Sequence, residues 1–203
     1  MKIADSENRP KYIIFAGCNG CGKSTLYHSC SNTFPYPRVN SDEVIKSFNG
    51  DWRNRVDRIK ADRLTVGLVR EYFSKHITFC QETTLCGKSI IRNIANARNE
   101  GYDIWIYYVG VADVEIAKKR IAFRVENGGH GIPDKDVERR YLETVQNMKA
   151  IWPMADKVTF FDNTVGFTYV AYYEDGDFIQ LTQELPVWIK EIIDCYPTTR
   201  TIV

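Results

Sequence analysis

Residues 17–25 read Gly-Cys-Asn-Gly-Cys-Gly-Lys-Ser-Thr, and no other stretch constrains the fold of this chain as strongly. Every fixed position of the pattern Gly-x-x-x-x-Gly-Lys-Ser/Thr is filled, by Gly17, Gly22, Lys23 and Ser24. In such a loop the glycines let backbone N–H groups turn inward around a phosphate. The apolar run 11–16 precedes the motif and predicts a buried strand, and a helix is predicted to begin at Lys23. The sequence therefore predicts a phosphate-binding loop between a strand and a helix.

This loop predicts binding of ATP and Mg²⁺. Lys23 is expected to reach the β- and γ-phosphate oxygens, and the Ser24 hydroxyl is expected to be a ligand of the metal. The nucleotide is expected to contact all nine loop residues: Gly17, Cys18, Asn19, Gly20, Cys21, Gly22, Lys23, Ser24 and Thr25. Cys18 and Cys21 also form a Cys-x-x-Cys pair, which leaves a redox or metal role as a minor alternative because the chain has no second such pair.

Alternating strand and helix patterns predict an α/β fold with an open, mostly parallel sheet of the P-loop kinase type, flanked by helices and carrying a helical lid. Residues 1–203 are expected to form a single domain, with 1–9 as a flexible tail and 166–203 as a small hairpin plus helix. The predicted strands are 11–16, 38–40, 77–81, 102–111, 157–161, 169–173 and 178–182. The predicted helices after the first are 52–75, 87–99, 113–126, 133–148 and 186–195. In the long helix, the inner face is expected to carry Ala61, Leu64, Leu68 and Tyr72.

The overall charge does not indicate a polyanionic partner. The net charge is +1, although residues 1–100 hold 16 Lys and Arg against 10 Asp and Glu, and residues 101–203 hold 11 against 16. No stretch approaches the roughly 18 apolar residues of a membrane span, and residues 1–9 lack the apolar region of an export signal. The sequence thus predicts a cytoplasmic protein with reduced cysteines, without a membrane or nucleic-acid partner.

Missing motifs narrow the class of P-loop protein. The chain has no Asn/Thr-Lys-x-Asp guanine motif at a strand end, no Leu-Ser-Gly-Gly-Gln signature, and no four apolar residues followed by Asp. These absences disfavour GTPase switches and motor ATPases. Kinases of small molecules need an acidic residue near the γ-phosphate and cationic residues that neutralise the transferring group.

Both kinds of residue are available. Asp42 and Glu82 follow predicted strands that are expected to flank the strand of the phosphate loop, although Asp42 could instead cap a helix and Glu82 could pair with a lysine. Four arginines flank the glycine-rich turn 127–133, which predicts a mobile lid: Arg120, Arg124, Arg139 and Arg140. Ordinary surface charge is the alternative for each of them.

Several motifs in order resemble the zeta toxin family of P-loop kinases from bacterial toxin–antitoxin systems. They are AGCNGCGKSTL, NSDEV, ETTLCG, RIAFRVENGGHGIP, ERRY and FDNT, between residues 11 and 165. The resemblance implies phosphorylation of a nucleotide sugar such as UDP-N-acetylglucosamine by ATP, and an antitoxin partner. It implies Asp42 as the base, Arg124 or Arg120 as the first lid arginine, and acceptor contacts from Glu82, Thr83 and Thr84.

One departure concerns the lid, where His130 stands in place of a second catalytic arginine. We expect His130 to serve as the cation, with Arg139 or Arg140 as the alternative and Arg140 as a contact to the substrate. The departure leaves the acceptor open: a dinucleotide, a metabolite or a nucleic-acid end are the other candidates. A third hypothesis, beside a nucleotide-sugar kinase and a kinase for another acceptor, is a non-catalytic ATP-binding switch protein.

Overall fold

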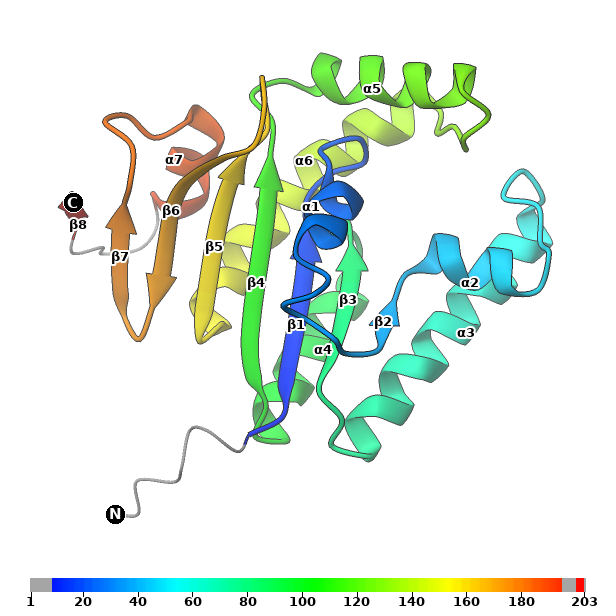
Figure 1. The fold of residues 1–203 in the computed structure, drawn as a ribbon, viewed down its shortest axis with the longest axis horizontal. Helices are drawn as coiled ribbons and strands as arrows, with labels where there is room; N and C mark the ends of the chain where they lie inside the picture. Colours follow the sequence, from blue (N-terminus) through cyan, green and yellow to red (C-terminus); the bar gives the residue numbers. More distant parts are fainter. Residues whose placement is uncertain (1–8, 195–199, 203) are drawn as a thin grey trace.

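The computed structural model describes residues 9–194 and 200–202, and a single eight-stranded sheet organises this part of the chain (Figure 1). The strand order is β2-β3-β1-β4-β5-β6-β7-β8. The first five of these strands run parallel, β6 is antiparallel to both of its neighbours, and β8 pairs parallel to β7. The strands are β1 (Lys11–Ala16), β2 (Arg38–Val39), β3 (Phe79–Thr83), β4 (Asp103–Gly110), β5 (Lys157–Asp162), β6 (Thr168–Glu174), β7 (Asp177–Gln180) and β8 (Arg200–Ile202). The predicted α/β class with an open, mostly parallel sheet is confirmed.

The helices cover the sheet and enclose its carboxyl end. They are α1 (Lys23–Ser29), α2 (Ser41–Ser47), α3 (Arg55–Ser74), α4 (Lys88–Asn99), α5 (Val114–Glu126), α6 (Asp134–Ile151) and α7 (Val187–Ile193), with a 3-10 turn at Trp152–Met154. In Figure 1, α1 lies in front of the sheet, α4 and α6 lie behind it, α5 lies across its upper end, and α2 and α3 form a separate side. No helix in the described ranges is long and apolar enough to cross a membrane.

Successive side chains of β1 point to opposite faces of the sheet, and each face has its own hydrophobic core. Tyr12, Ile14 and Ala16 join the larger core, which α3, α4, α6 and α7 cover. Ile13 and Phe15 face the other way, into the core beneath α1 and α5. Because a strand that is buried on both faces presents a continuous apolar run, β1 and its bounds were predictable from the sequence.

Other elements differ from the sequence expectations. Helix α2 was not predicted, and α3 begins at Arg55 rather than at residue 52. Three residues of the predicted inner face of α3 face the core, because Ala61 is buried and Leu68 and Tyr72 pack half-buried against it. The prediction was wrong for Leu64, which is 44% exposed, and it missed the buried residues Val69 and Phe73. Strand β2 borders β3 and not β1, which corrects the expectation that Asp42 follows a neighbour of the phosphate-loop strand. The predicted tail at 1–9 lies, apart from its last residue, outside the described residues, as does Cys195.

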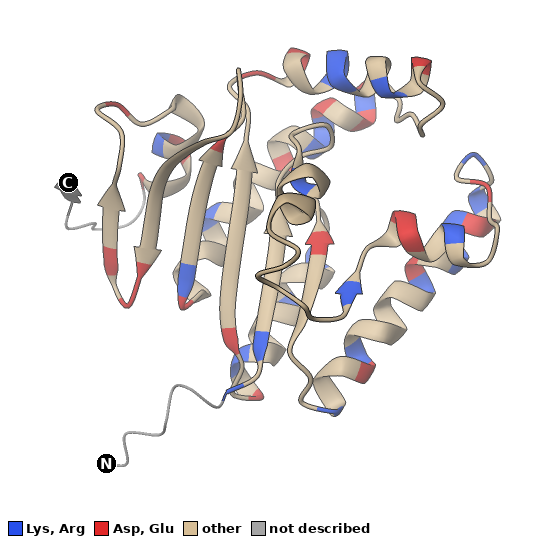
Figure 2. Cartoon of the chain, in the orientation of Figure 1, with Lys and Arg blue, Asp and Glu red and all other residues tan. Residues whose placement is uncertain are grey.

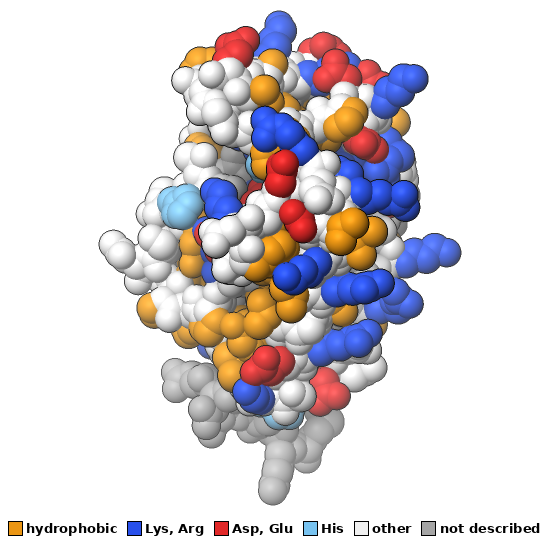
Figure 3. Space-filling view, turned by 90° about the vertical axis from the view of Figure 1, so that its right-hand side faces the viewer, with side chains coloured by type: hydrophobic (Ala, Val, Ile, Leu, Met, Phe, Trp, Pro, Cys, Tyr) orange, Lys and Arg blue, Asp and Glu red, His pale blue; other side chains and the backbone are white. Residues whose placement is uncertain are grey.

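Charged residues of both signs are frequent on the helices around the sheet (Figure 2). Lys and Arg are frequent on α3, α5 and the start of α6, interspersed with acidic residues (Figure 2). In the space-filling view onto the side formed by α2 and α3, basic side chains gather along one edge (Figure 3). These helices surround the carboxyl end of the sheet, where open α/β folds bind their ligands.

Candidate functional site

The phosphate loop connects β1 to α1 through backbone conformations that suit glycine. Gly17 and Gly22 have φ values of 140° and 108°, and a methyl group on Gly17 would lie 2.2 Å from the Val109 carbonyl oxygen. The Lys23 side chain is buried and folds over the loop, where its Nζ donates a hydrogen bond to the Cys18 carbonyl at 2.8 Å. The loop thus places a fixed ammonium group beside a cradle of backbone amides.

The two cysteines of the loop lie beneath it. Cys18 and Cys21 are both buried in the core under α1 and α5, and their side chains hydrogen-bond to each other. Burial raises the pKa of the Cys21 thiol, whereas the hydrogen bond with Cys18 and the charge of Lys23 lower it. The net effect lowers this pKa to about 7. Within the described ranges, no cluster of three or more His, Cys, Asp or Glu residues could hold a metal ion.

The Glu82 carboxylate connects the phosphate loop to β2. In the register of β1 and β3, Phe15 pairs with Glu82, so this carboxylate borders the start of the loop. Its Oε1 accepts a hydrogen bond from the Ser24 hydroxyl at 2.7 Å, and its Oε2 lies 2.5 Å from Arg38 Nη2 and 2.8 Å from Asn40 Nδ2. The alternative that Glu82 pairs with a lysine is not seen in the described part of the chain, where its cationic partner is Arg38, and the structure brings Glu82 to Ser24.

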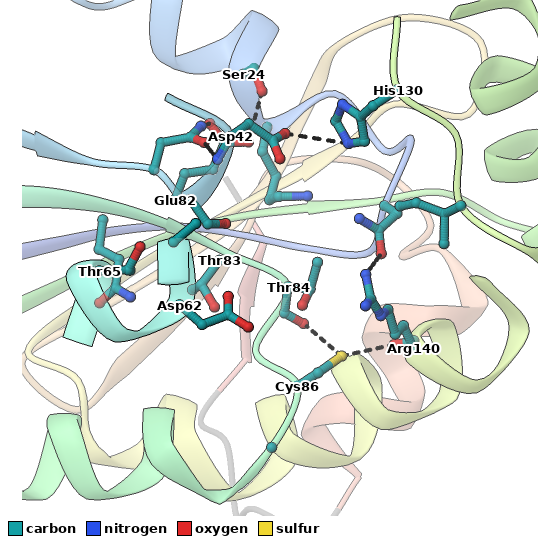
Figure 4. A pocket seen from close by; sticks show the side chains of 18 of the residues that line it. Ser24, Asp42, Asp62, Thr65, Glu82, Thr83, Thr84, Cys86, His130 and Arg140 are labelled. Carbon is teal, nitrogen blue, oxygen red and sulfur yellow. Dashed lines mark hydrogen bonds and ion pairs between the residues drawn. The ribbon is translucent and has the colours of Figure 1, made fainter. Parts of the chain in front are cut away.

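Asp42 and His130 face each other across the cavity mouth (Figure 4). Asn40, rather than Asp42, caps α2, because its side chain accepts from the backbone N–H of Asp42 at 2.8 Å. The Asp42 side chain is therefore free to point into the cavity, with Oδ2 3.4 Å from His130 Nε2. The imidazole also packs edge-on against Trp52, at 5.8 Å between ring centroids.

The charge of His130 is disfavoured in this arrangement. Burial lowers the pKa of His130 more than the Asp42 carboxylate raises it, and Arg124 adds to the lowering. The imidazole is therefore mainly neutral near pH 7. The expected role of His130 as a cation remains a prediction, and the structure supplies a different contact for it.

The lid arginines have unequal surroundings. Arg124 Nε donates to the His130 carbonyl at 2.9 Å, and Arg120 Nη2 donates to the Thr164 carbonyl at 3.3 Å. Each guanidinium also has a buried nitrogen for which the described residues offer no hydrogen-bond partner, Nη2 in Arg124 and Nη1 in Arg120. Arg140 Nη1 reaches Asn19 of the phosphate loop at 3.2 Å, whereas Arg139 pairs with Asp136 and Glu143 at the surface. Since buried donors normally have acceptors, Arg120 and Arg124 are suited to bind an anion.

One cavity of about 1390 Å³ joins these groups. Its donor half is lined by the phosphate loop, α5, and the loop that contains Asn163 and Phe167. Its acceptor half extends between α3 and α4, and its lining comprises Arg58, Asp62, Thr65, Val66, Val69, Arg70, Phe73, Gln81, Thr83, Thr84, Ser89, Arg92, Asn93 and Asn96. Small-molecule sites typically measure about 300–1,000 Å³, so this cavity has room for two ligands.

The acceptor half contains residues that the sequence did not identify. Asp62 and Thr65 project from α3 toward Thr83 and Thr84 at the end of β3 (Figure 4). Burial raises the pKa of Asp62, and the Thr65 hydroxyl is buried with no hydrogen-bond partner among residues 9–194 and 200–202. Both residues lie on the same side of α3 as Val69 and Phe73, and that spacing was the available signal.

Comparison with known proteins gives the family. Residues 13–150, more than half of the chain, match the family model described as AAA domain. The chain belongs to this AAA domain family. An uncharacterised protein of Haemophilus influenzae, a relative of this AAA domain chain, is 37% identical over 131 residues, which are 64% of this chain and 92% of that protein.

Solved structures share the fold of this AAA domain protein. One comes from the PezAT chromosomal toxin–antitoxin system of Streptococcus pneumoniae, with a TM-score of 0.62, 14% identity, and coverage of 80% of this chain and 71% of that one. Another is AvrRxo1-ORF1:-ORF2 with ATP, at 0.63 and 15%, covering 85% of this chain and 61% of that one. A third, from Chloroflexus aurantiacus and named provisionally as a kinase, gives 0.57 and 15%, covering 78% and 90%. At these identities the likeness establishes a P-loop kinase-like fold.

Proposed function

We propose that this chain is an ATP- and Mg²⁺-dependent kinase that transfers the γ-phosphate to a hydroxyl group of a nucleotide sugar, with UDP-N-acetylglucosamine as the first candidate. The observation that carries the proposal is the single cavity, whose lining includes the phosphate loop, Asp42 and the residues of the acceptor half. The motif resemblance to zeta toxins supports the same reaction, and the fold shared with a structure from the PezAT toxin–antitoxin system supports a P-loop kinase-like protein.

The donor half has the groups that phosphoryl transfer requires. Lys23 would contact the β- and γ-phosphate oxygens, and Arg120 and Arg124 would supply their unpaired N–H groups to the transferring phosphate. Ser24 and Glu82 fit a Mg²⁺ site, because a hydroxyl and a carboxylate 2.7 Å apart offer the hard oxygen ligands that this ion prefers. Bound there, Mg²⁺ would neutralise charge that develops on the phosphates.

Asp42 is proposed to accept the proton of the acceptor hydroxyl. The hydroxyl oxygen then forms the new bond to phosphorus as the bond to the ADP oxygen breaks, and the proton stays on the Asp42 carboxylate until product release. His130 is proposed to position this carboxylate through its contact at 3.4 Å. Thr83, Thr84 and Arg140 are proposed to hold the acceptor, and Glu82, given its contact to Ser24, is assigned to the metal side instead.

The charge of the acceptor half favours an anionic acceptor. Arg58, Arg70 and Arg92 line it, and none of them forms an ion pair within the described part of the chain. Unpaired guanidinium groups attract phosphate through charge and bidentate hydrogen bonds. A nucleotide sugar carries such a group at a distance from its hydroxyls, whereas a neutral metabolite does not.

The test is formation of ADP with and without an acceptor. A kinase for an added acceptor releases ADP only in its presence, and mass spectrometry of a nucleotide-sugar panel identifies the phosphorylated product. ADP formation that is independent of every acceptor would contradict the proposal, and ATP binding without ADP would favour the non-catalytic switch.

An antitoxin partner is a further part of the proposal. It rests on the PezAT toxin–antitoxin system and on the zeta toxin resemblance. Expression of the wild-type chain is expected to arrest growth, and the Lys23→Ala variant is expected to be harmless. Harmless expression of a chain that is active in the extract would contradict the toxin assignment while leaving the kinase assignment intact.

A further inference from the structure

The two oxygens of the Glu82 carboxylate have different surroundings. Oε1 accepts one hydrogen bond, from the Ser24 hydroxyl at 2.7 Å on the side of the phosphate loop (Figure 4). Oε2 accepts two, from Arg38 Nη2 at 2.5 Å and from Asn40 Nδ2 at 2.8 Å. Since each oxygen of a carboxylate accepts about two hydrogen bonds, Oε2 is fully used and Oε1 is the oxygen that is open to a cation.

The Arg38 guanidinium is held in place by more than Glu82. Only 8% of its side chain is exposed, its Nη1 donates to Glu43 Oε1 at 2.9 Å, and its Cζ lies 4.0 Å from the centroid of the Tyr27 ring. Its Nε is buried, and the described residues offer this nitrogen no hydrogen-bond partner. Because an unpartnered buried donor is unfavourable, the two carboxylates and the ring, rather than the needs of Nε, set the orientation of Arg38.

The Asn40 amide is fixed from its other end. It is buried, and its Oδ1 accepts from the Asp42 N–H at 2.8 Å as the cap of α2. The start of this helix therefore determines which way the Asn40 Nδ2 donor points. Both donors to Glu82 Oε2 are thus held by contacts that do not involve a bound cation.

We infer that Arg38 and Asn40 determine which divalent cation the nucleotide site accepts, because they restrict Glu82 to a single open oxygen. This selectivity rests on the proposed binding of a nucleotide with Mg²⁺ and adds to it the residues that discriminate between metals. Ca²⁺ takes about six to eight oxygen ligands and often both oxygens of one carboxylate, whereas Mg²⁺ requires a smaller octahedral arrangement. Occupation of Oε2 therefore removes a ligand from Ca²⁺ and none from Mg²⁺.

The test is isothermal titration calorimetry with the ATP analogue AMP-PNP, in excess Mg²⁺ and in excess Ca²⁺. The measured quantity is the Kd in Ca²⁺ divided by the Kd in Mg²⁺. Loss of the Arg38 charge acts on both ions, which carry the same charge, so this ratio reports the shape of the site. Arg38→Met is expected to lower the ratio about fivefold or more, because Oε2 becomes available to Ca²⁺.

Two further variants separate the metal site from the stability of the fold. Asn40→Ser removes the second donor to Oε2 and keeps a side chain that caps helices well, and it is expected to lower the ratio about two- to fivefold. Glu43→Gln is the matched control, because it removes the other ionic partner of Arg38, which is 51% exposed, and leaves the contact with Glu82. Its ratio is expected to equal that of the wild type. Should Arg38→Met fail to fold, Asn40→Ser decides the result.

A lower ratio in Arg38→Met and Asn40→Ser, with no change in Glu43→Gln, is the expected result. Equal changes of the Kd in both metals, or an unchanged ratio, would overturn the selectivity and leave nucleotide binding intact. Wild-type protein that binds AMP-PNP equally well with Ca²⁺ and with Mg²⁺ would also overturn it, because there would be no discrimination to explain. Wild-type protein that binds AMP-PNP with neither metal would overturn the proposed function as well.

Discussion

The two halves of the cavity are built in different ways. The part of the donor half that would hold phosphates depends on consecutive residues, because the glycines of the loop set the backbone and Lys23 follows directly. The acceptor half combines side chains from α3, α4 and β3 that are up to 38 positions apart, from Arg58 to Asn96. The phosphate-binding part of the donor half is therefore determined by a local motif. The acceptor half is determined by which faces of α3 and α4 line the cavity.

The strongest expected effect lies in the donor half. Lys23→Ala should lower the transfer rate by roughly 10²-fold or more, because it removes a preorganised cation from the transition state. The unfolding temperature and the rate are measured together, with Lys190→Ala on the exposed side of α7 as the control. A variant that keeps half of the wild-type rate would break the assignment of the donor half.

The second-largest expected effect is at Asp42, which we place between the donor half and the acceptor half. Asp42→Asn should lower kcat by about 10²-fold and leave the Kd of ATP unchanged, because the amide has nearly the same shape but cannot take the proton. Kinetics and calorimetry on the same preparation separate the two quantities. Parallel loss of ATP affinity and rate would move Asp42 into the donor half as a metal ligand.

His130 gives a smaller effect with an informative pH dependence. As a neutral group that positions Asp42, it should be replaceable by Asn, which can still donate to the carboxylate, with a loss of kcat of less than about tenfold. As a cation, it should be replaceable by Arg, and wild-type kcat should fall as the pH rises through the pKa of the imidazole. Since burial lowers that pKa, we expect no such alkaline loss between pH 7 and 9.

The smallest expected effect concerns the acceptor half, at Asp62. Asp62→Asn should raise the KM of the acceptor about two- to tenfold, the range for loss of one hydrogen bond, without changing the Kd of ATP. Steady-state kinetics with each substrate varied in turn measures both. Asp177→Asn in β7 controls for the loss of one exposed carboxylate. An unchanged acceptor KM would remove α3 from the acceptor site.

The same contrast explains what could be predicted from the sequence. The phosphate loop and β1 follow from local chemistry, because glycine conformations and a doubly buried strand leave signatures in consecutive residues. The complete inner face of α3 does not follow from local chemistry, because apolar residues occur all around this helix. Its orientation is fixed by distant packing such as Phe73 against Tyr12, at 5.2 Å between ring centroids.

Contacts between distant segments were likewise beyond prediction. That His130 meets Asp42 depends on how the lid and α2 are placed, and not on spacing within one segment. The Asn40 cap of α2, in contrast, is a local contact two residues long, so its signal was present in the sequence. The resemblance to zeta toxins pointed to Asp42 and His130 as site residues, and the structure shows that they contact each other.

One cavity is proposed to join an ATP site to the site of an anionic acceptor. The most direct measurement is mass spectrometry of UDP-N-acetylglucosamine and other nucleotide sugars after incubation with the protein, ATP and Mg²⁺. We expect one acceptor to gain a single phosphate, with an equal amount of ADP and no product from the Lys23→Ala variant. Full turnover of ATP to ADP with every acceptor unmodified would contradict the account.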